Sequence, residues 1–193
     1  MNECKLSENN WTRVAVFAGG DRGHYRTDFD CFVGVDRGSL WVLEEDLPLT
    51  LAVGDFDSVT AEERQLIQKR ARHFVQAQPE KDDTDLELAL LTIFEQNPQA
   101  QVTIFGALGG RIDHMLANVF LPSNPKLAPY MRQIAIEDGQ NLIAYCPEGT
   151  SQLKPRSDYD YLAFMPVRDS QLTILGAKYE LTEENFFFKK VYA

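Results

Sequence analysis

Apolar runs that end in glycine and aspartate recur along the first half of the chain, separated by segments of helical periodicity. Each run is short and closed by turn residues, so we expect buried strands at 13–20, 31–38, 49–58 and 101–105. Strands that alternate with helices predict a mostly parallel α/β sheet. Ligands of such sheets bind beyond the carboxyl ends of the strands, where these glycines and aspartates lie.

Helical patterns follow the expected strands from the second one onward. We expect helices at 39–45, 60–71 and 84–96, and a further helix that starts at 111. Thr60 and Thr84 each precede a glutamate by three residues, which is the spacing of a capping box at a helix start. The strand and helix patterns therefore support each other.

The pattern changes after about residue 125. Short apolar runs split by glycine, proline and aspartate follow, without a strong amphipathic helix. This is typical of an antiparallel β domain of sandwich or barrel type. We expect an α/β domain over residues 1–125, a β domain over residues 126–193, and a linker at "PSNPKLAP" (122–129).

Charge and composition exclude several classes of protein. The net charge of −10 argues against binding to the nucleic-acid backbone. It remains compatible with a small phosphorylated ligand, because a divalent cation can bridge carboxylates and phosphates. No apolar run approaches the about 18 residues of a membrane span, and the N-terminus lacks a signal-peptide core. The three scattered cysteines form no disulfide or zinc pattern, so we expect a cytoplasmic protein.

The sequence "GDFDS" places Asp55 and Asp57 two residues apart at a strand end. In extended backbone both side chains would point to the same side, and two such carboxylates suit a hard cation such as Mg²⁺. The alternative is a turn with solvated aspartates, because aspartate and glycine are turn residues.

A second acidic group, in "EKDDTDLE" (80–87), comes just before a helix. One or two aspartates at a helix N-terminus are explained by the helix dipole, which favours negative charge by about 0.3–1 kcal/mol each. Asp82, Asp83 and Asp85 exceed that need and repel one another, so a shared cation would relieve the repulsion. Asp82 and Asp85 could share one face of the first turn.

The stretch "GALGGRIDH" (106–114) suggests phosphate binding. Gly109 and Gly110 would let a ligand approach the backbone closely, and Arg111 offers a planar fork for phosphate oxygens. The alternative is a local ion pair between Arg111 and Asp113. For His114 a structural hydrogen bond is favoured over catalysis.

Four motifs, "GVDRG", "VGDFDSV", "EKDDTDLELAL" and "GALGGRIDHMLANV", occur in the order and spacing of the thiamine pyrophosphokinase family. The C-terminal "LAFMPVRDSQLTILGAKYELTEENF" resembles the β domain of that family. The resemblance implies a catalytic α/β domain that binds ATP and Mg²⁺, followed by a thiamine-binding β-sandwich, in a homodimer. It also implies transfer of the pyrophosphoryl group of ATP to the hydroxyl of thiamine, which gives thiamine diphosphate and AMP.

The resemblance also implies roles for individual residues. The magnesium-binding carboxylates of the family match Asp55, Asp57 and Asp85. Positions around the nucleotide phosphates match Lys81, Asp82, Arg111 and Asp113, with Gly109 and Gly110 beside them and Asp36 in the loop after the second strand. The residues expected to take part in catalysis are Asp57, Asp85, Arg111 and Asp113. For the general base, Asp57, Asp85 and Asp113 stay open, as does activation of the hydroxyl by metal alone.

The chain departs from the family at its C-terminal end. Members of the family continue past "ENFFFKKVYA" with a Ser-Asn-Glu segment and a β-hairpin, so we expect this sequence to be truncated after Ala193. Two alternative functions remain. The first is a nucleotide- or thiamine-binding module without turnover, which would keep the pocket. The second is an aspartate-dependent phosphatase, which would use "DFDSV" with Asp55 as nucleophile.

Overall fold

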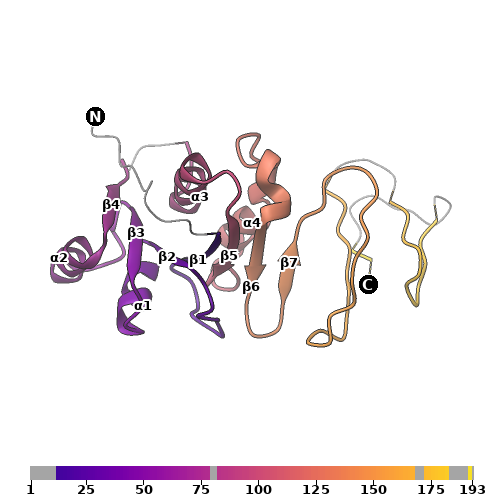
Figure 1. Cartoon of the computed structure of the whole chain (residues 1–193), viewed down its shortest axis with the longest axis horizontal. Helices are drawn as coiled ribbons and strands as arrows, with labels where there is room; N and C mark the ends of the chain where they lie inside the picture. The colour runs from indigo at the N-terminus through magenta and orange to yellow at the C-terminus, as the bar shows by residue number, and fades with distance from the viewer. Residues whose placement is uncertain (1–11, 79–81, 168–171, 183–190, 193) are drawn as a thin grey trace. The chain divides into compact units, whose positions relative to one another are not determined.

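Seven strands form one sheet in the first of the two compact units of the chain. The computed structural model describes residues 12–78, 82–167, 172–182 and 191–192, and it divides the chain into residues 1–151 and 152–193. The strands lie in the order β4-β3-β2-β1-β5-β6-β7 (Figure 1). Their bounds are β1 Arg13–Phe17, β2 Cys31–Val35, β3 Leu49–Gly54, β4 His73–Gln76, β5 Gln101–Phe105, β6 Ile134–Glu137 and β7 Leu142–Ala144. All neighbouring strands are parallel except β6 and β7.

The two faces of the sheet are covered by different helices. Successive side chains of a strand point to opposite faces, so Val14 and Val16 of β1 enter one core while Ala15 and Phe17 enter the other. The first core includes α3 (Asp85–Gln96). The second includes α1 (Gly38–Glu44) and α2 (Ala61–Arg70). Figure 1 shows α3 on the opposite side of the sheet from α1 and α2. The expected α/β class is confirmed.

Both expected capping boxes are present. Glu63 N–H donates to the Thr60 hydroxyl at 3.2 Å, and the Glu63 carboxylate accepts from Thr60 N–H at 2.7 Å. Thr84 and Glu87 repeat the arrangement at the start of α3, with distances of 3.2 and 2.8 Å. These caps satisfy backbone donors that the first helical turn leaves free, and they fix where α3 starts.

The connection between β1 and β2 contains no helix. Aromatic side chains cover the sheet there instead: Tyr25 packs edge-on against Phe17 at 5.5 Å between ring centroids, and Phe29 packs against Phe105 at 5.8 Å. Arg26 fixes this segment to β6 through two hydrogen bonds to the buried carboxylate of Glu137, at 3.0 and 3.1 Å. The loop therefore covers the sheet here, as a crossover helix does elsewhere.

The division between the two units lies later than expected from the sequence. Residues 122–129, expected as a linker, carry parts of two 3₁₀ helices, Leu121–Ser123 and Ala128–Gln133. Leu127 is fully buried there, and Tyr130 stacks on Phe94 at 4.2 Å. β6 then pairs in parallel with β5, so residues 126–151 belong to the first unit. The apolar pattern of β6 and β7 indicated strands but not the sheet that they join.

The described part of the second unit contains antiparallel pairing and no helix. Isolated bridges join Phe164 to Tyr192 and Ile174 to Leu181. This agrees with the β domain expected after the α/β domain. Among the described residues, no helix is long and apolar enough to cross a membrane.

Candidate active site

The carboxyl ends of the central strands meet at a topological switch point. From β1 the chain builds outward through β2, β3 and β4, then returns to the other side of β1 as β5. The loops after β1 and β5 touch there: Gly20 N–H donates to the carbonyl oxygen of Gly106 at 3.0 Å. A Cβ at Gly20 would lie 2.4 Å from that oxygen, so this approach requires glycine. Such switch points are the usual ligand-binding crevices of α/β sheets.

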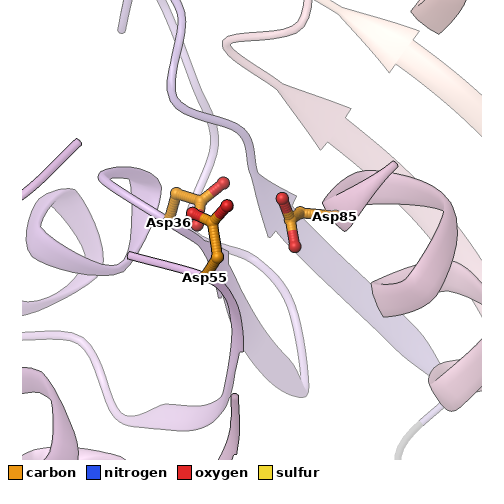
Figure 2. Close-up of side chains that lie close together, drawn as sticks. All are labelled: Asp36, Asp55 and Asp85. Carbon is orange, nitrogen blue, oxygen red and sulfur yellow. The ribbon is translucent and has the colours of Figure 1, made fainter. Parts of the chain in front are cut away.

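Three carboxylates come together beside this point. Asp36 follows β2, Asp55 follows β3, and Asp85 is the first residue of α3. One oxygen from each lies within 4.8 Å of the others, and all three residues are half-buried. Figure 2 shows Asp36 and Asp55 side by side with Asp85 facing them across the gap. The structure therefore groups Asp36 with Asp55 and Asp85, two of the three carboxylates (Asp55, Asp57 and Asp85) that were expected as metal ligands.

Backbone conformation places Asp36 in this group. Asp36 has a φ of +47° and Phe56 a φ of +60°, a region that residues other than glycine seldom adopt. Phe56 N–H donates to Asp36 Oδ1 at 3.1 Å. The buried Phe56 ring stacks on Phe74 at 4.7 Å, which holds the strained turn in place. Backbone strain at such a position is typical of functional sites.

The electrostatics of the group disfavour its full ionisation. Burial, and then the neighbouring charge of Asp85, raises the pKa of Asp36 to about 6, although the hydrogen bond from Phe56 N–H opposes this rise. Asp55 and Asp57 add smaller contributions in the same direction. A bound cation would remove the repulsion among these like charges.

Asp57 lies next to the cluster but outside it. β3 ends at Gly54, and the following residues form a turn, so the extended backbone that would point Asp55 and Asp57 to one side is not present. Asp57 is exposed, and its backbone N–H donates to Asp55 Oδ1 at 3.0 Å. The three-carboxylate group found among the described residues does not include its carboxylate. The segment after β3 therefore forms the turn that was the alternative to an extended pair of carboxylates, and this turn carries Asp55 into the cluster.

The second acidic segment is divided among different partners. Asp83 pairs with Lys126 at 2.7 Å and accepts a hydrogen bond from Asn124 at 3.4 Å, and Lys126 lowers the pKa of Asp83. Lys126, rather than a shared cation, therefore offsets the charge of Asp83. Asp82 is exposed, and Lys81 lies outside the described residues.

The glycine-rich loop forms an open turn before α4 (Ile112–Val119). Gly109 and Gly110 have φ values of +82° and +69°, and a Cβ at either would meet no described atom within 4 Å. Arg111 donates from Nε and Nη2 to the two carboxylate oxygens of Asp113, at 3.2 and 2.6 Å. This is the local ion pair that the sequence offered as the alternative to phosphate binding. Both residues are exposed. The arginine hydrogen bond lowers the pKa of Asp113 to about 2.

Residues that anchor the glycine-rich loop were not identified from sequence. The Asn118 amide donates to the carbonyl oxygen of Ala107 at 2.9 Å, which ties α4 back to the loop. The Tyr145 hydroxyl donates to the carbonyl oxygen of Val119 at 3.0 Å, at the end of α4. No local pattern indicates Tyr145, because it lies 26 residues from its partner. Asp36, in contrast, carries the strand-end signal that Asp55 also carries. His114 is exposed.

The donor set of the cluster fits a hard divalent cation. Mg²⁺ binds oxygen ligands at 2.0–2.1 Å, so opposite ligands lie about 4.2 Å apart. The spread of up to 4.8 Å among Asp36, Asp55 and Asp85 is slightly larger. A cation held partly through water would fit these carboxylates, and Mg²⁺ usually keeps several of its waters in proteins.

Comparison with known proteins gives consistent matches over both units. Residues 23–130 match the family described as "Thiamin pyrophosphokinase, catalytic domain", and residues 150–193 match "Thiamin pyrophosphokinase, vitamin B1 binding domain". The chain is 35% identical to thiamine pyrophosphokinase of Bacillus subtilis over 176 residues, which cover 87% of this chain and 81% of that protein.

Solved structures agree with these sequence matches. A thiamin pyrophosphokinase family protein from Enterococcus faecalis shares 44% identity with a TM-score of 0.84, over 94% of this chain and 87% of that chain. Thiamin pyrophosphokinase from Geobacillus thermodenitrificans shares 35% identity with a TM-score of 0.73, over 93% of this chain and 84% of that chain.

Proposed function

This chain belongs to the thiamin pyrophosphokinase family, and we propose that it transfers the pyrophosphoryl group of ATP to the hydroxyl group of thiamine. The products are thiamine diphosphate and AMP. The observation that carries this proposal is that Asp36, Asp55 and Asp85 converge at the carboxyl edge of the sheet. Such a cluster fits the cation that the reaction of this family needs. Neither a binding module without turnover nor a phosphatase is favoured by the family matches.

The reaction requires charge neutralisation and alignment. The thiamine hydroxyl oxygen forms a bond to the β-phosphorus, the bond from that phosphorus to the α,β-bridging oxygen breaks, and AMP leaves with the electron pair. Negative charge on the triphosphate repels the incoming oxygen, so cationic groups and fixed in-line geometry supply most of the catalysis. Arg111 is proposed to bind phosphate oxygens, and Gly109 and Gly110 leave room for them.

Mg²⁺ is the proposed cofactor, held by Asp55 and Asp85 with Asp36 as a third ligand. When bound it would offset the phosphate charges. Asp57 stays a proposed ligand, although its carboxylate lies outside the cluster in this structure. Lys81 and Asp82 stay proposed as neighbours of the nucleotide phosphates.

The choice of general base is narrowed by the pair at the start of α4. Arg111 lowers the pKa of Asp113 to about 2, so this carboxylate is a poor proton acceptor near neutral pH. We propose that Asp113 takes part in catalysis by holding Arg111 rather than by accepting the proton. Asp57 and Asp85 remain as candidate bases.

We also propose a cytoplasmic homodimer in which thiamine binds between the catalytic domain of one subunit and the β domain of the other. An apolar stripe on α4 and its C-cap residue supports an interface: Ile112, Leu116 and Phe120 are spaced by four residues and are 70%, 44% and 38% exposed. No residue of α4 is buried in the single chain. Light scattering should give twice the chain mass at micromolar concentration, and Leu116→Glu should shift the protein toward monomer. A fully active wild-type monomer would contradict this proposal.

The activity is tested by following AMP and thiamine diphosphate in one reaction with ATP, Mg²⁺ and thiamine. Both products should form in equal amounts, and neither should form without thiamine. ATP binding without AMP release would indicate a binding module. Phosphate release together with a covalent aspartyl-phosphate on Asp55 would indicate the phosphatase.

A further inference from the structure

Arg37 is a cation at the carboxyl edge for which the proposed function has no role so far. It directly follows Asp36, precedes α1, and is exposed. Its Nη1 donates to the carbonyl oxygen of Ser58 at 3.4 Å, in the loop after β3. On the side of β1, a Cβ at Gly19 would lie 3.7 Å from the Cβ of Arg37. Arg37 therefore lies where the loops that follow β1, β2 and β3 meet.

No ion pair within the described part of the chain neutralises the charge of Arg37. No described carboxylate lies within 4.0 Å of its guanidinium, although Asp36 is its neighbour in the sequence and Asp57 precedes Ser58. Arg111 and Lys126, in contrast, are both paired with aspartates. A guanidinium carries five N–H donors, and the hydrogen bond to Ser58 uses one of them. The remaining donors can bind an external anion.

We propose that Arg37 binds phosphate oxygens of the nucleotide, as a second guanidinium beside that of Arg111. This inference rests on the proposed function. β2 and β5, the strands that precede the two arginines, are separated only by β1 and hence by about 10 Å. Gly19 and Gly20, which follow β1 between them, carry no side chains. A polyphosphate across the end of β1 can therefore receive a planar cation from each side.

The other possible role of Arg37 is to hold the turn that carries Asp55, through its contact with Ser58. The two roles differ in what they change. Loss of a direct phosphate contact weakens ATP binding and leaves the Mg²⁺ requirement at saturating ATP unchanged. Loss of a tether displaces Asp55 and raises the Mg²⁺ concentration needed for half-maximal activity.

The test compares Arg37→Ala, Arg37→Lys and the control Arg70→Ala. Arg70 is an exposed arginine at the end of α2, 3.7 Å from Asp46, so its removal changes net charge equally without touching the site. Kd for ATP is measured by calorimetry, and kcat and KM for ATP and thiamine are measured from AMP formation. Thermal melts check that each variant folds.

We expect Arg37→Ala to lower kcat/KM for ATP and to weaken ATP binding by about 10- to 100-fold, as for a lost hydrogen bond to a charged group. Arg37→Lys should recover part of the loss, and KM for thiamine and the Mg²⁺ requirement should stay near wild type. Equal ATP binding in wild type and Arg37→Ala, or a loss matched by Arg70→Ala, would overturn the inference. A raised Mg²⁺ requirement with unchanged ATP affinity would also overturn it. If wild type binds ATP but forms no AMP, the proposed function fails, while the calorimetry still decides the role of Arg37.

Discussion

A Cβ atom at Gly54 would lie 1.8 Å from Oδ1 of Asp36. Gly54 ends β3, and Asp36 follows the end of the neighbouring parallel strand β2. The Asp36 carboxylate occupies the space that a side chain at Gly54 would fill. From there the carboxylate reaches Phe56 N–H and the two other aspartates of the cluster. The absence of a side chain at Gly54 is thus a condition for the cluster to form.

Gly54→Ala should therefore displace the Asp36 carboxylate from the cluster. We expect a loss of about 1–3 kcal/mol in unfolding free energy from overpacking, and a large fall in kcat/KM for AMP formation. Urea melts and steady-state kinetics measure the two effects. Gly23→Ala is a suitable control, because Gly23 has a positive φ of +49° but open space around it. It should cost only about 1–2 kcal/mol of backbone strain and leave activity near wild type.

The raised pKa of Asp36 predicts a pH dependence of stability. Below about pH 4 this carboxyl is protonated in both folded and unfolded chains, and above pH 6 it is charged in both. Between these values the unfolded chain releases its proton first, so the contribution of Asp36 to stability falls as pH rises from about 4 to 6.

Asp36→Asn should remove this penalty. We expect the variant without Mg²⁺ to be more stable than wild type at pH 7 by about 1 kcal/mol, since partial exposure screens the charge, and equally stable at pH 3.5. Thermal melts at both pH values measure the difference. A constant difference across this range would show that Asp36 titrates normally.

Removal of a single carboxylate should weaken cation binding. Asp55→Asn and Asp85→Asn should each raise the Mg²⁺ concentration needed for half-maximal activity by about tenfold or more, as for other losses in metal sites. Asp83→Asn is the matched control, because Asp83 is paired with Lys126 instead. Titration of Mg²⁺ at fixed ATP measures the concentration needed for half-maximal activity in each of the three variants. An equal effect of all three substitutions would place the ion elsewhere.

Arg111 should contribute to transition-state stabilisation rather than to folding. Arg111→Ala is expected to lower kcat/KM on the order of 10²–10⁴-fold, and Arg111→Lys less, since lysine keeps the charge but lacks the planar fork. The melting temperature should barely change, because the pair with Asp113 is exposed on both sides. Near-normal turnover of Arg111→Ala would leave the glycine-rich loop with a purely structural role.

The parts of this protein that the sequence predicted are those set by local chemistry. The capping boxes at Thr60 and Thr84 depend on residues three positions apart, and both are present where the pattern indicated. Parallel β/α order is likewise a property of the chain read in sequence. The short β6 was identified as a strand, but its parallel pairing with β5 depends on contacts that lie some 30 residues away.

The sequence by itself determined which residues end the strands: Asp36, Asp55 and the glycines, and Asp85 at a helix start. The tertiary structure decided how they group. It joined Asp36 to Asp55 and Asp85, turned Asp57 to solvent, and gave Asp83 to Lys126, 43 residues away. The physical reason is that side-chain partners across a parallel sheet depend on strand order and on turn conformations such as that of Phe56, and no local pattern of residues encodes either.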